Sequence, residues 1–298
     1  CIRDRRFTAV HPRGLTPGSV SDAPAIWLDG KPATSLPLPD RGLDFGDGLF
    51  ETLLLQGNRV LFGDLHLERL KRGLEVLQFP SCIAEVARQL HSVAIDIGAE
   101  DRRWSALRIT VTRGTGPRGY APPPSPTPRI IIVRSELDSD YGVMASPAVL
   151  SLAAVRWPSQ PAFAGLKHLN RLEQVIAARE YRLAGTDEAV MLNQSGEPVS
   201  VVAGNLFLVD KQRLLTAPLH SCGIAGTRRE LIMRRWGPTL GLCIEETTLS
   251  LQQLADADEL FYSNCLVGLR PIASFAGRAW ASHDVCKALY RLYREDMA

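Results

Sequence analysis

One lysine stands apart from the other cations of this sequence. Lys167 follows a small apolar run, residues 162–166, and precedes a segment, residues 169–176, whose apolar residues recur at helical spacing. The chain has five lysines against twenty-nine arginines, and only a lysine amine, once desolvated, can form a Schiff base with an aldehyde. The segment therefore predicts covalent aldehyde chemistry at Lys167. The alternative is a lysine whose amine extends into solvent from a helix N-terminus.

Two further features could bind a phosphate group. Arg69 lies in a predicted helix that Asp64 can cap and that must end near Pro80, and its guanidinium is a bidentate partner for phosphate. Residues 223–228, GIAGTR, form a glycine-bearing loop before another helix, where backbone N–H groups can bind an anion. Singly, these features are also typical of a solvated arginine and of a plain turn. Together with Lys167 they predict a site for a phosphorylated aldehyde cofactor.

The histidines and cysteines form no metal motif. The six cysteines lie far apart, without a C-x-x-C pair, which argues against a zinc site or a disulfide framework and favours free thiols in a reducing compartment. His66 and His168 have no companions at ligand spacing, and no Ser-His-Asp pattern is present. We therefore expect no metal and a cytoplasmic location.

The composition is that of a globular protein without a charged partner surface. The chain has 298 residues, of which 45% are apolar and 22% charged, and a net charge of +2 with acids and bases interspersed. This balance predicts neither a nucleic acid nor a membrane partner. Residues 1–24 carry several arginines without an apolar core, so we expect a disordered or extraneous leader and no secretory signal.

The elements that must position these residues indicate an α+β protein. Apolar alternation predicts strands such as residues 105–113, whereas helical spacing predicts helices such as residues 83–97. Because strands and helices do not alternate regularly, a doubly wound sheet is disfavoured. A polar, glycine-containing stretch divides the pattern, so the predicted organisation is an N-terminal domain (25–137), a linker (138–146) and a larger C-terminal domain (147–298) that carries the lysine.

Several motifs, in their order along the chain, resemble one enzyme family. They are DRGLDFGDGLFET (40–52), HLERL (66–70), PRGY (117–120), LKHLNRLEQV (166–175), GNLFLV (204–209) and CGIAG (222–226). This combination resembles the fold type IV pyridoxal-phosphate enzymes: the D-amino acid and branched-chain aminotransferases and 4-amino-4-deoxychorismate lyase. The resemblance extends from about residue 26 to 290. It implies a two-domain α+β fold with pyridoxal 5'-phosphate between the domains, a small-molecule substrate and a homodimer.

The resemblance also implies roles for individual residues. Lys167 falls on the lysine that holds the cofactor aldehyde and later acts as general base and acid. Arg69 falls on the phosphate-binding arginine, and Thr227 and Arg228 fall where backbone amides meet the same phosphate. Ile224 falls on the aliphatic residue that packs against the pyridine ring.

On the substrate side, the segments 118–120 and 167–175 most closely resemble the lyase branch of the family. Arg118 lies where the aminotransferases hold a substrate carboxylate, so the resemblance assigns it the ring carboxylate; the alternative is a surface arginine in a loop. Phe50 occupies a position where a D-amino acid aminotransferase has a tyrosine, and the loss of that hydroxyl counts against this activity.

Two positions depart from the family pattern. Ser200 stands five residues before the asparagine of the NLF motif, where the family has a glutamate that keeps the pyridine nitrogen protonated. A serine cannot hold a pyridinium, so the cofactor should be a weaker electron sink, which handicaps transamination more than elimination. Cys265 stands where relatives have a hydroxyl on the phosphate, and a thiol is a weaker donor. Asn264 or Ser263 could replace it.

These inferences predict a pyridoxal phosphate-dependent lyase of folate biosynthesis, which converts 4-amino-4-deoxychorismate to 4-aminobenzoate and pyruvate. One alternative is an aminotransferase on the same scaffold. The other is a non-catalytic descendant that retains the cleft, and Ser200 is compatible with it.

Overall fold

The computed structural model describes residues 25–97 and 104–298, so the predicted leader lies outside the described residues. The first unit is built on an antiparallel sheet with the strand order β2-β1-β6-β5-β3-β4. Its strands are β1 (Ala25–Leu28), β2 (Lys31–Pro32), β3 (Gly48–Gln56), β4 (Arg59–Val60), β5 (Trp104–Thr112) and β6 (Arg129–Glu136).

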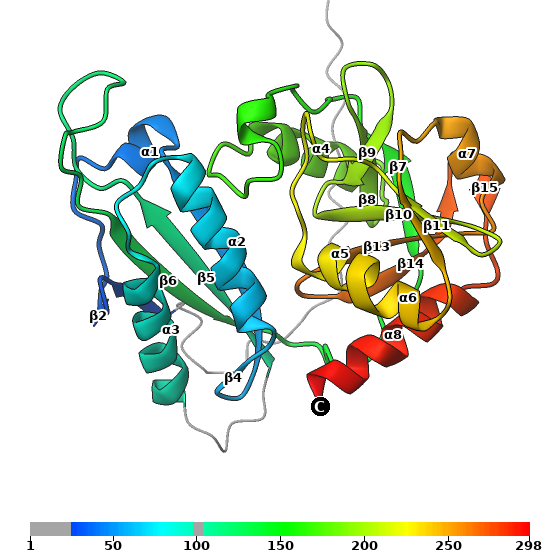
Figure 1. Cartoon of the computed structure of the whole chain (residues 1–298), viewed down its shortest axis with the longest axis horizontal. Helices are drawn as coiled ribbons and strands as arrows, with labels where there is room; N and C mark the ends of the chain where they lie inside the picture. Colours follow the sequence, from blue (N-terminus) through cyan, green and yellow to red (C-terminus); the bar gives the residue numbers. More distant parts are fainter. Residues whose placement is uncertain (1–24, 98–103) are drawn as a thin grey trace, which may run out of the picture.

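Two helices cover this sheet, and a short helix precedes β3. These are α1 (Arg41–Phe45), α2 (Gly63–Val76) and α3 (Ile83–Ile97), and Figure 1 shows α2 and α3 side by side in front of the sheet. Leucines spaced along α2 pack with branched residues of β3 and β5 into one apolar core, as the helical and alternating patterns predict. Asp64 lies in the first turn of α2, but its side chain does not cap the helix, since Phe62 is the N-cap residue.

The second unit is a mixed sheet with the order β12-β11-β10-β13-β14-β7-β8-β9, and β15 pairs with β14. Its strands are β7 (Ala148–Leu152), β8 (Glu188–Leu192), β9 (Pro198–Val201), β10 (Gly204–Asp210), β11 (Arg213–Thr216), β12 (Cys243–Glu246), β13 (Glu259–Asn264), β14 (Gly268–Phe275) and β15 (Arg278–Ala279). Its helices are η1 (Pro161–Phe163), α4 (Leu172–Leu183), α5 (Thr227–Leu231), η2 (Ile232–Trp236), α6 (Gly237–Thr239), α7 (Leu251–Asp256) and α8 (Asp284–Met297). The predicted linker falls between β6 and β7, where one sheet ends and the other begins.

The apolar segment 199–209 forms two strands and not one continuous strand. It forms a tight hairpin, in which β9 turns at Val202 and Ala203 into the antiparallel β10. Gly204 permits this turn, because a Cβ there would lie 2.7 Å from the carbonyl oxygen of Ser263. As a result Ser200 pairs with Asn205 across the hairpin.

An apolar cluster joins the two units. Leu54 and Trp104 of the first unit pack in the same buried cluster as Trp236 and Tyr293 of the second. Figure 1 shows α8, in red, running beneath the second sheet toward the first unit. Within the described residues, no helix is both long enough and apolar enough to cross a bilayer. The α+β fold class predicted from the pattern is confirmed.

Candidate active site

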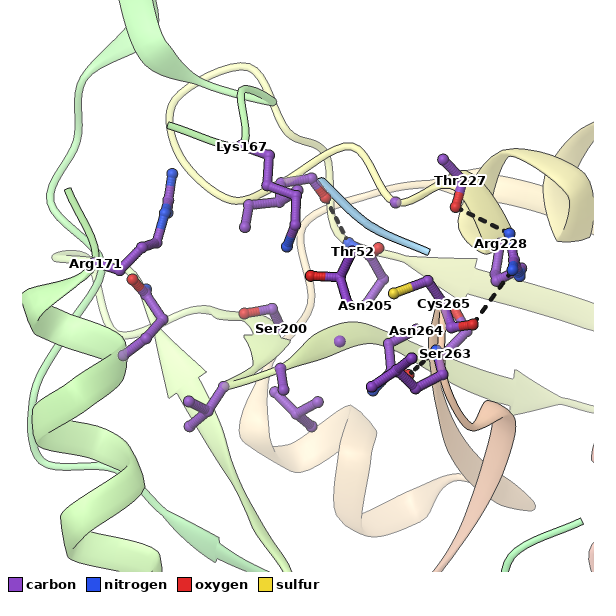
Figure 2. A pocket seen from close by; sticks show the side chains of 18 of the residues that line it. Thr52, Lys167, Arg171, Ser200, Asn205, Thr227, Arg228, Ser263, Asn264 and Cys265 are labelled. Carbon is purple, nitrogen blue, oxygen red and sulfur yellow. Dashed lines mark hydrogen bonds between the residues drawn. The ribbon is translucent and has the colours of Figure 1, made fainter. Parts of the chain in front are cut away.

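A cavity of about 330 Å³ lies between the two units. Its walls come from β3 and α2 of the first unit and from β9, β10, α5 and the end of β13 in the second. The stretch between residues 157 and 174 forms a further wall. Figure 2 shows polar side chains from β3, β9, β10, α5, the end of β13 and the stretch 157–174 converging on one space. The cavity brings together every predicted site residue except Arg118.

The backbone of Lys167 bridges the two units. Its carbonyl oxygen accepts a hydrogen bond of 2.9 Å from the amide of Phe50, and Leu169 donates to the carbonyl of Gly48 at 3.0 Å. Two residues earlier, Gly165 exchanges hydrogen bonds with the loop at Gly223 and Ala225. The lysine is therefore held in an extended stretch ahead of α4, between an edge of the first sheet and the predicted phosphate loop.

The amine of Lys167 points into the cavity, as Figure 2 shows. Its Nζ lies 4.3 Å from the ring centroid of Phe50. Burial, with repulsion from Arg69, lowers the pKa of Lys167 to about 8. Because the amine lies in the cavity, the alternative of an amine extending into solvent is wrong. With this pKa about a tenth of the amine is neutral at pH 7.

Arg69 is buried on α2 and held by a carboxylate that the sequence analysis missed. Its Nε donates to Glu51 Oε1 at 2.7 Å, and one terminal nitrogen donates to the carbonyl of Ala225 at 2.8 Å. His66 Nδ1 lies 2.7 Å from Glu51 Oε2. Burial alone would raise the pKa of Glu51, but Arg69 and His66 outweigh it and hold this pKa at about 2. Burial lowers the pKa of His66 to about 4, so its ring is neutral and donates to Glu51.

The N-terminus of α5 and the end of β13 form one side of the cavity. Arg228 is buried and donates to Thr227 Oγ1 at 3.2 Å and to the carbonyl of Cys265 at 3.3 Å. Among the residues that the structure describes, neither its Nε nor the buried hydroxyl of Ser263 has a hydrogen-bond partner. Asn264 is engaged elsewhere, since its Oδ1 accepts from the backbone amides of residues 266 and 267. Buried donors without acceptors are what an oxyanion binding here would satisfy.

Ser200 lies on the hairpin of β9 and β10, and a hydrogen bond joins this hairpin to Ile224. Trp157 Nε1 donates to Ser200 Oγ at 2.9 Å, and both residues are buried. Asn205 lies beside Ser200 on the hairpin and donates to the carbonyl of Ile224 at 2.9 Å, which fixes the loop before α5. Ile224 also lines the cavity.

The charge lining the cavity is of one sign. Among the described residues its walls contain Arg69, Lys167, Arg171 and Arg228 but no carboxylate. Arg171 is the N-cap residue of α4 and donates to the carbonyls of His168 and Leu166. Burial lowers the pKa of Arg171 to about 10. The cavity is therefore suited to an anionic ligand.

Arg118 lies elsewhere. It is exposed on the loop between β5 and β6, at the upper left of Figure 1, and does not line the cavity. Arg41 holds this loop by donating to the carbonyls of Gly119, Tyr120 and Ala121 at 3.2, 2.7 and 3.3 Å. The described residues contain no group of His, Cys, Asp and Glu that could hold a metal ion.

The sequence analysis missed Glu51, Trp157 and Arg171. A glutamate in an otherwise apolar strand was the only available signal for Glu51. Arg171 lies within the segment that resembles the lyases, but the direction in which its side chain points depends on the residue at which α4 begins. No local pattern marks Trp157, whose partner is 43 residues away.

Comparison with known proteins assigns this arrangement to a family. The model of the amino-transferase class IV family matches residues 48–275. The chain belongs to this family. The fold is therefore that of the fold type IV enzymes, and the cofactor of this family is pyridoxal phosphate. The residues present fit that group, because the cavity offers a partly neutral amine for an aldehyde and unpartnered donors for a phosphate.

Among class IV relatives, an aminodeoxychorismate lyase of Vibrio harveyi is 30% identical over 254 residues, 84% of this chain and 91% of that protein. The crystal structure of 4-amino-4-deoxychorismate lyase from Pseudomonas aeruginosa superposes with a TM-score of 0.82 at 35% identity, covering 91% of this chain and 99% of that one. The branched-chain amino acid aminotransferase of Escherichia coli has the same fold, with a TM-score of 0.81 at 21% identity, covering 90% and 93% of the two chains.

Proposed function

We propose that this class IV protein is a lyase that converts 4-amino-4-deoxychorismate to 4-aminobenzoate and pyruvate in folate biosynthesis. Its similarity to two such lyases, over more than four fifths of the chain in each case, supports this substrate. The observation that carries the proposal is the amine of Lys167, buried beside Phe50 in a cationic cavity.

In this proposal Lys167 binds the aldehyde of pyridoxal phosphate covalently. Arg69, Thr227, Arg228 and Cys265 surround the phosphate; the hydroxyl of Ser263 supplements the weak thiol donor of Cys265. Ile224 would pack against the ring, and Ser200 would contact the ring nitrogen. The burial of Arg228 and Ser263, with donors unpartnered, supports this placement of the phosphate.

The cofactor supplies an electron-withdrawing group that acidifies the C–H bond beside the substrate nitrogen. The amine of Lys167 would accept that proton as a general base. The bond between the adjacent carbon and the enolpyruvyl oxygen would break, so that the substrate ring becomes aromatic and the leaving enolpyruvate takes up a proton to become pyruvate. The lowered pKa of Lys167 supports this role, because the amine is neutral often enough to accept a proton near pH 7.

The absence of a carboxylate among the described residues of the cavity favours elimination over transamination. An aminotransferase must hold a full negative charge on the cofactor, and an acid at the ring nitrogen assists this. An elimination transfers that charge to the leaving group as it forms, so Ser200 is a smaller handicap.

Arg171 is the better placed of two candidate partners for a substrate carboxylate. Its guanidinium lines the cavity, and no described carboxylate forms an ion pair with it. Arg118 could contact a substrate only in the cavity of a second copy of the chain. We propose a homodimer in which the loop that carries Arg118 faces the partner's cavity, and the exposed side chains of Leu38, Leu43 and Tyr120 near this loop support it.

The free cysteines support a reducing, cytoplasmic location.

The test begins with the protein as purified. We expect a visible cofactor band that disappears when borohydride reduces the imine and fixes the cofactor onto Lys167, located by peptide mass. We also expect release of 4-aminobenzoate and pyruvate in equal amounts from the substrate. A protein with the band but without aminobenzoate, whose cofactor is converted by amino acids to the pyridoxamine form, is an aminotransferase. A protein that shows no band even after incubation with pyridoxal phosphate is a non-catalytic descendant.

A further inference from the structure

The hydroxyl of Ser200 has a fixed direction of hydrogen bonding. Trp157 Nε1 lies 2.9 Å from Ser200 Oγ, and the two residues are 5% and 3% exposed. An indole N–H can only donate, so the serine oxygen is the acceptor. The hydroxyl hydrogen then remains available, and among the described residues nothing accepts it. Because Ser200 lines the cavity, a ligand atom bound there can accept this hydrogen.

The surroundings hold this arrangement in place. Trp157 donates its backbone amide to the carbonyl of Leu192 and packs in a buried cluster with Ala177 and Met191, so the indole has little freedom to turn. Ser200 lies in β9, where it is paired with Met191 on one side and Asn205 on the other. Both partners of the hydrogen bond are therefore fixed by the sheet.

The arrangement of atoms in pyridoxal phosphate indicates which ligand atom accepts the hydroxyl hydrogen of Ser200. In pyridoxal phosphate the ring nitrogen stands para to the carbon that bears the aldehyde, so a ring attached at Lys167 presents its nitrogen to the opposite wall. Figure 2 shows Ser200 across the cavity from the amine of Lys167, with Thr227 and Arg228 to one side. A pyridine nitrogen accepts a hydrogen bond only when it is unprotonated.

The charge of the cavity favours the same protonation state. A pyridinium would add a positive charge to a site whose described walls already contain Lys167, Arg69, Arg171 and Arg228. The nearby carboxylate of Glu51 is already paired with Arg69 and His66. Of the four cations, Arg69 and Arg228 would bind the phosphate and Lys167 the aldehyde, so Arg171 is the cation that no described carboxylate of the cavity offsets. Its like charge disfavours the protonated form.

We propose that Ser200 donates a hydrogen bond to an unprotonated ring nitrogen of pyridoxal phosphate, and that Trp157 is the positioning residue that sets this direction. The inference rests on the proposed binding of the cofactor at Lys167. It adds the protonation state of the ring nitrogen in the bound cofactor. A neutral ring withdraws electrons less strongly, so the Trp157–Ser200 pair selects reactions with a good leaving group and slows competing transamination.

The test is the ¹⁵N resonance of the cofactor ring, measured on holoenzyme loaded with pyridoxal phosphate labelled at the ring nitrogen. We expect the wild-type resonance downfield, in the position of an unprotonated nitrogen, and constant across the pH range in which the holoenzyme is stable. A resonance at the upfield position of a pyridinium overturns the inference, whatever the lyase activity. A protein that binds no cofactor, seen by the missing visible band, overturns the proposed function as well.

Variants test the two residues separately. In Ser200→Glu the carboxylate should retain a proton on the nitrogen and move the resonance upfield. In Ser200→Ala the nitrogen stays unprotonated but loses its donor, so the resonance should move further downfield than in the wild type. Trp157→Phe should shift it in the same direction as Ser200→Ala, by less. A purely structural role for Trp157 would leave this resonance at the wild-type position, and that outcome, or no shift in Ser200→Ala, overturns the proposal.

Discussion

The amine of Lys167 couples cofactor uptake to pH. Its pKa of about 8 arises from burial and from repulsion by Arg69. Because only the neutral amine attacks an aldehyde, we expect the rate of covalent uptake by the apoprotein to fall about tenfold per pH unit below this pKa and to level off above it. Stopped-flow absorbance of the visible band measures this rate. A rate that still rises steeply well above pH 8 would show an amine with the pKa of an exposed lysine.

Arg171 and Arg118 are distinguished by one pair of variants. If Arg171 binds the substrate carboxylate within the same chain, Arg171→Gln loses a charge-assisted hydrogen bond worth about 1.5–3 kcal/mol, and KM should rise about 10- to 100-fold. Arg118→Gln removes an exposed guanidinium and should raise KM only if a second copy supplies it to the cavity. Steady-state release of 4-aminobenzoate gives both values. An unchanged KM in Arg171→Gln would contradict the assignment to Arg171.

At the scale of elements, Glu51 connects β3 to α2 through its ion pair with Arg69. Replacing it with the isosteric glutamine leaves Arg69 buried without its counter-ion, which costs about 3–5 kcal/mol in comparable buried pairs. We expect the urea midpoint of the apoprotein to fall accordingly in Glu51→Gln. Glu85→Gln is the matched control, since Glu85 forms an exposed ion pair with Arg88 on α3 and its loss should leave the midpoint nearly unchanged. Equal midpoints in the two variants would contradict a structural role for Glu51.

The contribution of the same ion pair to the free energy of unfolding decreases at low pH. Glu51 has a lowered pKa in the folded protein, about 2 against an ordinary 4.5. Its contribution to the free energy of unfolding is therefore complete above about pH 4.5 and is lost as the pH falls toward 2. In Glu51→Gln this part of the acid dependence should be missing.

The loop before α5 depends on one close contact. Gly226 is the N-cap residue of α5, and a Cβ there would lie 2.0 Å from Asn205 Oδ1. Gly226→Ala should displace Asn205 from the carbonyl of Ile224 and weaken cofactor binding by about 1–3 kcal/mol, the usual cost of overpacking. Equilibrium titration with pyridoxal phosphate measures the change. Gly63→Ala, where the nearest atom is a Val60 methyl at 3.3 Å, should bind the cofactor as the wild type does.

Features formed by residues close together in the sequence could be predicted from it, whereas contacts between distant segments could not. The helix 83–97 and the strand 105–113 follow directly from local periodicity. The Lys167 segment and the loop 223–228 are also local, and the structure places both at the cavity. The Glu51–Arg69 and Trp157–Ser200 contacts join different elements, so they depend on strand register and helix packing that one sequence does not encode locally. The turn at Val202 was missed because its residues are apolar and continue the strand pattern.

At the scale of the whole molecule, the proposed homodimer is open to direct measurement. Tyr120 is 87% exposed on a loop that Arg41 holds in place, and its ring lies 5.5 Å from that of Phe45. If this loop meets a second copy, Tyr120→Asp should shift the mass in solution toward the monomer and raise KM for the substrate. Light scattering coupled to size exclusion gives the mass. Leu251→Asp, at an exposed apolar position at the start of α7 in the second unit, far from this loop in Figure 1, is the control and should leave the dimer intact.

The extended stretch around Lys167 also has a dynamic consequence. Its backbone is hydrogen-bonded to β3 on one side and to the loop at Gly223 and Ala225 on the other, so separating the two units must break one of these ladders. A cofactor bound covalently to this lysine, with its phosphate bound near α5, would hold the two units together at their interface. Deuterium uptake at the amides of Phe50 and Ala225 should then slow together when the cofactor binds, which makes these two amides paired reporters of opening at this interface.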